Sequence, residues 1–157
     1  MSKTIKREII AIIKQMEGII GKEALSGLFD SSDRATGDKR VGCNQFREIA
    51  SECSAAECYE EIVLLIQYTQ AKSKPEQSWK TRCANGKAFG EVVTDQMKQV
   101  RALCSNPEDW NSLKEPIQLF FGYLYWQSRI WADAYKQTDS IHGSPKSNNF
   151  RQTKRGN

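Results

Sequence analysis

The chain has little of what a metal site, a disulfide scaffold or a catalytic dyad needs. A single histidine, His142, occurs among its 157 residues, and it lies in a polar stretch near the C-terminus. The five cysteines are an odd number, and no two have the CxxC spacing typical of structural zinc sites. We therefore expect no metal, no cofactor and reduced thiols, with Cys53, Cys58 and Cys104 packed as small apolar side chains.

Long apolar runs are also missing. Mean hydropathy is -0.62, and polar or charged residues interrupt even the most apolar stretch, Pro116 to Gln137. That stretch falls short of the roughly 20 consecutive apolar residues of a membrane span. Lys14 and Glu17 interrupt the N-terminal isoleucines, and no signal-peptide pattern follows them. The expectation is a cytoplasmic protein that makes no membrane contact.

Apolar residues recur at helical spacing along most of the chain. No candidate strand has a second strand to pair with. The sequence therefore predicts an all-α fold, a single-domain bundle of about four to five helices over residues 1–137, followed by a disordered basic tail at 138–157. The predicted helices span residues 4–28 with a break near Gly21, 44–72 with a kink between 51 and 56, 86–104, and 116–137 after a short turn at 110–113.

The last predicted helix, with Pro116 at its first position, has two apolar stripes. A helix that is apolar nearly all round is packed on more than one side, by its own chain or by its own chain and another protein. Tyr125, Trp126 and Arg129 are of the residue types enriched at protein interfaces, so Tyr125 and Trp126 are candidate interface residues. The stripes are Ile117, Phe120, Phe121, Leu124, Trp131 and Tyr135, and Leu119, Tyr123, Trp126, Ile130 and Ala134.

The formal net charge of +4 is unevenly distributed. Residues 72–87 hold five basic residues and one acidic residue, and residues 138–157 hold four and one, so any anion-binding surface should be local. Solvated loops and ordinary exposed helix faces account equally well for such charges. The candidate RNA-contacting residues are Arg34, Lys39, Arg40, Lys72, Lys74, Lys80, Arg82, Lys87, Lys98, Arg101 and Arg129.

Trp79 lies among Lys74, Lys80 and Arg82. An aromatic residue among cations is the pattern of a platform on which single-stranded bases stack. A tryptophan is more often largely buried, in which case Trp79 would fold back as a lid on the core. Both interpretations fit the sequence.

No arrangement of catalytic residues is recognisable. Gly86-Lys87 lacks the rest of a phosphate-binding P-loop. The Arg–His spacing of small helical ribonucleases of the HEPN type is missing, because His142 has no arginine four to six residues before it. We therefore expect a binding module and not an enzyme.

In its size, its helical segments, its cationic surface and its C-terminal helix with the run YLYWQSRIWADAYK, the chain resembles the small all-helical subunit of type III CRISPR effector complexes. The resemblance covers about residues 5–137 as a pattern, without the loop at 30–43 or the tail. It implies a non-catalytic subunit of an RNA-guided antiviral ribonucleoprotein complex. Such a subunit stacks with neighbouring subunits, with copies of itself as one option, and contacts the backbone of guide and target RNA without sequence specificity.

The resemblance implies that Lys98, Arg101 and Arg129 face backbone phosphates and that the aromatic helix serves subunit packing. An alternative without the resemblance is a helical protein-interaction or regulatory module that has no role with nucleic acid. Its partner would bind the aromatic helix.

Overall fold

The structure, a computed structural model, describes the backbone of residues 2–30 and 40–155 and the side chains of residues 2–30 and 40–135. Within these ranges the fold is all-α, without a β-strand, as predicted, and one isolated bridge joins Arg82 to Ala88. The elements are α1 (Lys3–Ile20), α2 (Lys22–Phe29), α3 (Asn44–Ala55), α4 (Tyr59–Ala71), the 3-10 helix η2 (Ser78–Lys80), α5 (Phe89–Ala102) and α6 (Trp110–Arg155).

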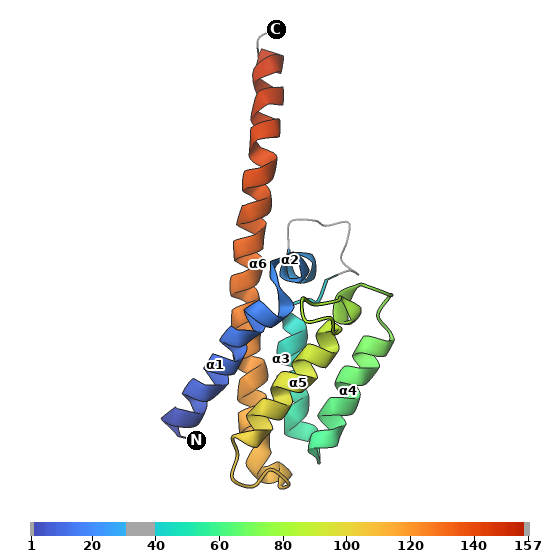
Figure 1. The fold of residues 1–157 in the computed structure, drawn as a ribbon, viewed down its shortest axis with the longest axis vertical. Coiled ribbons are helices and arrows are strands. Elements are labelled where there is room, and N and C mark those ends of the chain that lie inside the picture. The colour runs from blue at the N-terminus through green and yellow to red at the C-terminus, as the bar shows by residue number, and fades with distance from the viewer. Residues whose placement is uncertain (1, 31–39, 156–157) are drawn as a thin grey trace.

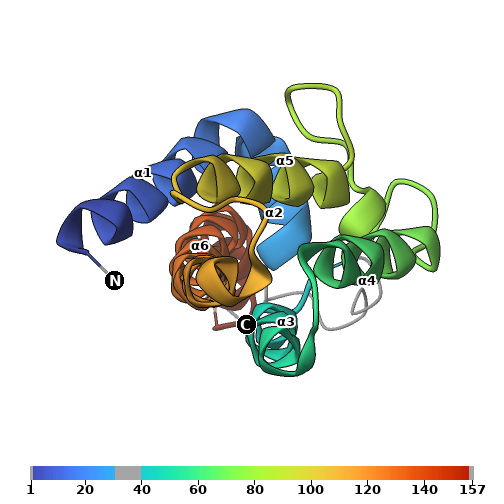
Figure 2. The ribbon, with the colours of Figure 1, turned by 90° about the horizontal axis from the view of Figure 1, so that it is seen from below.

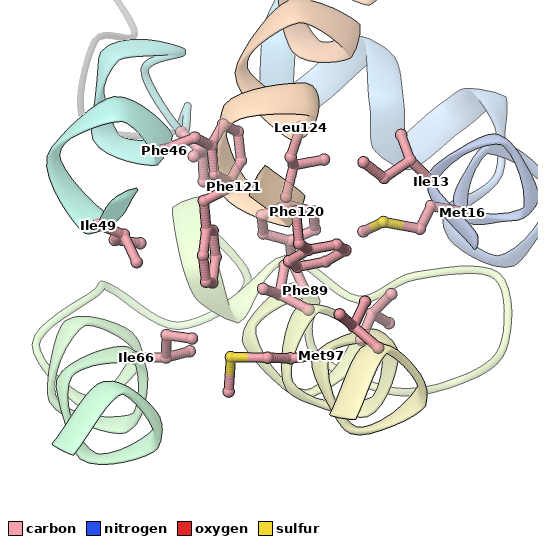
Figure 3. Packing of buried hydrophobic residues seen from close by; sticks show 14 of the residues in the cluster. Ile13, Met16, Phe46, Ile49, Ile66, Phe89, Met97, Phe120, Phe121 and Leu124 are labelled. Carbon is pink, nitrogen blue, oxygen red and sulfur yellow. The ribbon is translucent and has the colours of Figure 1, made fainter. Parts of the chain in front are cut away.

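α6 is the helix around which the others are arranged. It packs against α1, α2, α3 and α5, whereas α4 lies at the far edge of the bundle from α1 (Figures 1 and 2). The first apolar stripe faces inward: Phe120 and Phe121 lie edge to face, 5.0 Å between ring centroids. Figure 3 shows these rings among side chains from α1, α3, α4 and α5. The core is thus built on the stripe that the sequence predicts to be buried.

The first predicted helix breaks at Gly21, as expected. The Ser2 hydroxyl caps its start by accepting the Ile5 N–H at 3.2 Å. At its other end, the carbonyls of Ile19 and Ile20 accept N–H groups from residues 85 and 84 at 3.3 and 2.9 Å. These carbonyls would otherwise lack partners, since a helix leaves its last carbonyls unbonded. The loop before α5 therefore completes the end of α1.

The second predicted helix also breaks, but between Ala55 and Tyr59, at the end of the predicted kink at 51–56 and beyond it. The carbonyl of Ala56 in this break accepts the indole N–H of Trp110 at 2.8 Å. A buried bond of this kind satisfies a backbone group that the break leaves open. It also fixes the start of α6 against the α3–α4 junction.

The predicted start of the last helix was wrong. Pro116 does not occupy its first position, because α6 begins at Trp110 and continues through Pro116 without interruption. The Asp109 side chain accepts the Asn111 N–H at 3.3 Å and so caps the earlier start. Pro116 cannot donate a helix hydrogen bond, which costs free energy. The burial of Trp110 and Leu113 offsets this cost.

The backbone of α6 remains helical as far as Arg155, beyond the predicted end at Gln137, and this last part extends away from the bundle (Figure 1). Only the backbone is described from residue 136 onward. The disordered tail predicted for residues 138–157 stays a prediction.

Candidate docking and RNA-contacting surfaces

The second apolar stripe of α6 is only partly covered by the rest of the chain. Its members Leu119 and Tyr123 are half-buried, whereas Trp126 is 63 % and Ile130 57 % exposed. The rings of Tyr123 and Trp126 lie 5.5 Å apart between centroids. We call these four residues the α6 face. Large apolar side chains that are exposed together mark interaction sites more often than single ones do.

α1 forms one edge of the α6 face. Lys14 donates to the Gln127 side chain at 2.8 Å, and Trp131 donates to Glu17 at 2.9 Å. The later residue of α1 pairs with the later residue of α6, so the two helices run in the same direction here. Ile10, which is 40 % exposed and one turn before Lys14, therefore lies level with Tyr123, one turn before Gln127.

Cations flank the α6 face on both sides. Arg7, Ile10 and Lys14 share one side of α1, because residues three, four and seven apart lie together on a helix. On the opposite side Arg129 is exposed, and Arg47 of α3 places its guanidinium 5.2 Å from the ring centre of Tyr125. The face is thus an aromatic and aliphatic strip between basic edges.

The two predicted interface residues differ in their surroundings. Trp126 points outward, but Tyr125 is half-buried beneath Arg47. Ile10 and Ile130 were not predicted as interface residues. Ile130 belongs to the second apolar stripe, but the sequence of a stripe does not show whether other helices of the same chain bury it. Ile10 became recognisable only through the alignment of α1 with α6.

Most of the predicted RNA-contacting residues that the structure describes already have contacts within the chain. Arg101 donates to the Pro107 carbonyl at 2.7 Å and to Glu108 at 3.3 Å, and it stacks over Tyr59. Arg82 pairs with Glu76 at 3.5 Å, and Lys87 with Asp95 at 2.8 Å. Arg40 donates to the Asp30 carbonyl at 2.8 Å, and the ammonium of Lys72 lies 5.1 Å from the Tyr68 ring centre.

Other predicted residues have fewer contacts within the chain. Lys80, Lys98 and Arg129 have side chains without a hydrogen-bond or ion-pair partner in the part of the chain that the structure describes, and Lys74 is exposed. Arg34 and Lys39 lie outside the described residues. A cation without an internal partner can approach a phosphate without first breaking a contact, so Lys80, Lys98 and Arg129 are the better candidates.

The structure brings only some of these residues together. Arg40 and Arg129 line one open groove of about 390 Å³, which Asp133 also borders. Lys98 and Arg101 lie in the last turns of α5, whereas the segment from Lys72 to Lys87 precedes its first turn. The basic residues therefore form separate groups and not one continuous stripe.

Trp79 is a core residue. Its side chain is 1 % exposed, donates to the Gln45 side chain at 2.6 Å and packs against the rings of Phe46 and Phe89. Of the two interpretations from the sequence, the lid on the core is confirmed. A base cannot stack on this indole.

Cys53 and Cys104 pack in the bundle as predicted, as do Cys43 and Cys83, whereas Cys58 is half-buried in the break before α4 and is not part of the core. Burial raises the pKa of the Cys53 thiol to about 12 and that of Cys83 to about 11. A thiol with such a pKa is protonated at neutral pH and is a poor nucleophile. The described residues contain no group of three or more histidine, cysteine or acidic side chains placed to hold a metal ion.

Comparisons of the chain with protein-family models, with curated proteins and with solved structures give no match. In the ranges described, no helix is both long enough and apolar enough to cross a membrane. The α6 face and the cations Lys80, Lys98 and Arg129 are the described features that bear on function.

Proposed function

We propose that this chain is a non-catalytic subunit of an RNA-guided antiviral ribonucleoprotein complex, as its resemblance to the type III small subunit implies. The observation that supports this best is the α6 face. The helix that forms the core of the bundle also presents Trp126 and Ile130 to solvent between basic edges. A subunit whose role is to pack against neighbours needs such a surface, and an aromatic centre with a charged rim is typical of protein interfaces.

RNA contact is the second part of the proposal. Lys80, Lys98 and Arg129 bind backbone phosphates, with Lys74 and the 30–43 loop contributing further charge. Contacts of this kind are independent of sequence, and their affinity falls as salt rises. Arg82, Lys87 and Arg101 have a smaller part, because each would have to leave an internal partner.

A titration with single-stranded RNA over a range of salt concentrations tests this part. We expect weak binding whose dependence on salt falls in the variant Lys80→Ala/Lys98→Ala/Arg129→Ala. Each lost phosphate contact on a single strand lowers the logarithmic slope by about 0.7, so the triple variant loses about 2.

The matched control is Lys3→Ala/Lys6→Ala/Lys22→Ala, which removes the same charge from other exposed helix positions. The control should retain most of the salt dependence. Equal losses in both triple variants would show that only net charge matters. No binding by the native chain at low salt would contradict the proposed RNA contact.

A protein-interaction module without a nucleic-acid role is the second candidate. The internal pairing of Arg82, Lys87 and Arg101 favours it, since these charges already contribute to the fold. In that case the RNA titration would show no binding. Replacement of Trp126 and Ile130 would still abolish binding of the partner.

A further inference from the structure

The groove that Arg40 and Arg129 line lies where three parts of the chain meet. Its walls are the end of α2, residues 40–44 leading into α3, and residues 129–133 of α6. α6 packs against both α2 and α3 (Figures 1 and 2). The volume of the groove, about 390 Å³, is within the range of roughly 300–1,000 Å³ that is usual for small-molecule sites.

Contacts within the chain hold these walls in place. The Val41 N–H donates to the Leu28 carbonyl at 3.0 Å, which fixes the segment before α3 to the end of α2. The rings of Phe29 and Trp131 lie 5.6 Å apart between centroids and join α2 to α6. The groove is therefore formed before a ligand arrives, as small-molecule sites usually are.

Two arginines and one aspartate border the groove. Arg129 is exposed and has no hydrogen-bond or ion-pair partner among the described residues. Arg40 is half-buried and donates to the Asp30 carbonyl at 2.8 Å, but its Nε is buried without a partner in the part of the chain that the structure describes. Asp133 is the only acidic side chain among the described residues that line the groove. The lining therefore has one uncompensated positive charge.

The charge of the lining and the geometry of its arginines favour a carboxylate. A carboxylate has one negative charge, which matches the one uncompensated positive charge, and its two oxygens fit the planar fork of a guanidinium. A phosphate monoester has almost two negative charges at neutral pH, and the Asp133 carboxylate disfavours the second. An anion here also lowers the cost of keeping Arg40 half-buried with an unpaired donor.

The inner wall of the groove is apolar. It consists of Leu28, Phe29, Val41 and Ala132, none of which is more than 8 % exposed. Small-molecule sites combine such a wall with a few polar groups that set the orientation of the ligand. A ligand with an apolar body therefore suits this groove better than the sugar–phosphate chain of a nucleic acid does.

We propose that this groove binds a small organic monocarboxylate with an apolar body. Arg40 and Arg129 hold the carboxylate, the apolar wall contacts the body, and Asp133 disfavours dianions. The inference goes beyond the proposed function and does not depend on it. A bound carboxylate would occupy Arg129, so the ligand and RNA would compete for this one side chain.

Titrations of the full chain, followed by two-dimensional NMR, test the site with three probes that share one apolar ring. Benzoate has one negative charge, phenyl phosphate has almost two, and benzamide has none. We expect benzoate to give saturable shifts of the amide signals of residues 41–44 and 129–133, and the other two probes to bind several-fold more weakly. Shifts that rise linearly with benzoate and spread over the whole surface would overturn the proposal, as would tighter binding of phenyl phosphate or benzamide than of benzoate.

Three single variants assign the roles of the side chains. Arg129→Gln should weaken benzoate binding about tenfold, as expected for the loss of a charge-assisted hydrogen bond. Lys6→Gln, the matched control, removes the same charge from an exposed position on α1 and should leave the affinity unchanged. Equal losses in these two variants would overturn the assignment to the groove.

Asp133→Asn, the third variant, tests the selectivity. It removes one negative charge, so the affinity for phenyl phosphate should rise about twice as much as that for benzoate on a logarithmic scale. Equal gains for the two probes would contradict the role given to Asp133. Both Arg129 and Asp133 are exposed, so these variants should fold, which circular dichroism would verify. The samples contain no RNA, so a failure of benzoate to bind would overturn this inference and leave the RNA contact to its own titration.

Discussion

Gly21 joins α1 to α2 in a conformation that few other residues adopt. Its φ is +86°, and a Cβ added there would lie 2.9 Å from the Cβ of Ala84. Neither atom can move without its backbone, because the Ala84 N–H is bonded to the end of α1. At this position glycine is needed both for its positive φ and for the close approach of the loop.

We expect Gly21→Ala to lower the free energy of unfolding by about 1–3 kcal/mol, measured by urea denaturation. Gly18→Ala is the matched control, three residues earlier, with open space around it and without a positive φ. The control should raise stability by about 1 kcal/mol, since alanine is the better helix former. Equal effects of the two substitutions would contradict the strain assigned to Gly21.

The buried thiols predict how stability depends on pH. The pKa of Cys53 is raised from 9.0 to about 12 and that of Cys83 to about 11, mainly by desolvation. Above pH 9 the unfolded chain loses protons that the folded chain keeps, so the contribution of these thiols to stability is complete below pH 9 and is lost as the pH rises toward 11–12. The free energy of unfolding should therefore fall with alkaline pH.

The variant Cys53→Ala isolates this effect. Its stability should fall less steeply between pH 9 and 11 than that of the native chain, although its stability at pH 7 is lower because of the cavity. Urea denaturation at several pH values measures both slopes. Identical slopes would show that other groups dominate the alkaline loss.

At the scale of elements, two tryptophans that were both candidates for a binding surface have opposite roles. Trp79 connects the loop after α4 to Phe46 of α3 and Phe89 of α5, whereas Trp126 lies on the open side of α6. A tryptophan among lysines suggested a binding platform, but its indole proved to be part of the core. Burial, and not the charge of sequence neighbours, decided the role of Trp79.

We expect Trp79→Ala to lower the free energy of unfolding by about 3–5 kcal/mol, because it leaves a large cavity and removes the partner of Gln45. Trp126→Ala should change it by no more than about 0.5 kcal/mol. Chemical denaturation measures both values. A large loss in Trp126→Ala would mean that this side chain stabilises the bundle, which would argue against the α6 face as a free surface.

The helices of this bundle could largely be predicted from the sequence, because apolar periodicity reports the buried faces directly. The break at Gly21 coincides with a weak point of the pattern, and the break at residues 56–58 begins at the end of the weak segment 51–56. The start of α6 could not be predicted, since Pro116 is a typical first residue and only the buried bond from Trp110 to Ala56 reveals the earlier start.

At the scale of the whole molecule, the candidate sites depended on contacts between distant segments. The sequence identified Trp126, but the edge formed by Ile10 and Lys14 requires the alignment of α1 with α6. From the sequence alone, eleven basic residues were candidates for RNA contact. Ion pairs and backbone bonds separate Arg82, Lys87 and Arg101 from the open cations, and no local pattern encodes those partners.

The central claim is that the α6 face is where this protein meets a partner. Hydroxyl-radical footprinting, read residue by residue by mass spectrometry, tests it directly. In dilute protein Trp126 should be oxidised far faster than Trp79, Trp110 and Trp131, which are 1 %, 8 % and 2 % exposed. Oxidation of Trp126 as slow as that of these three buried indoles would contradict the account.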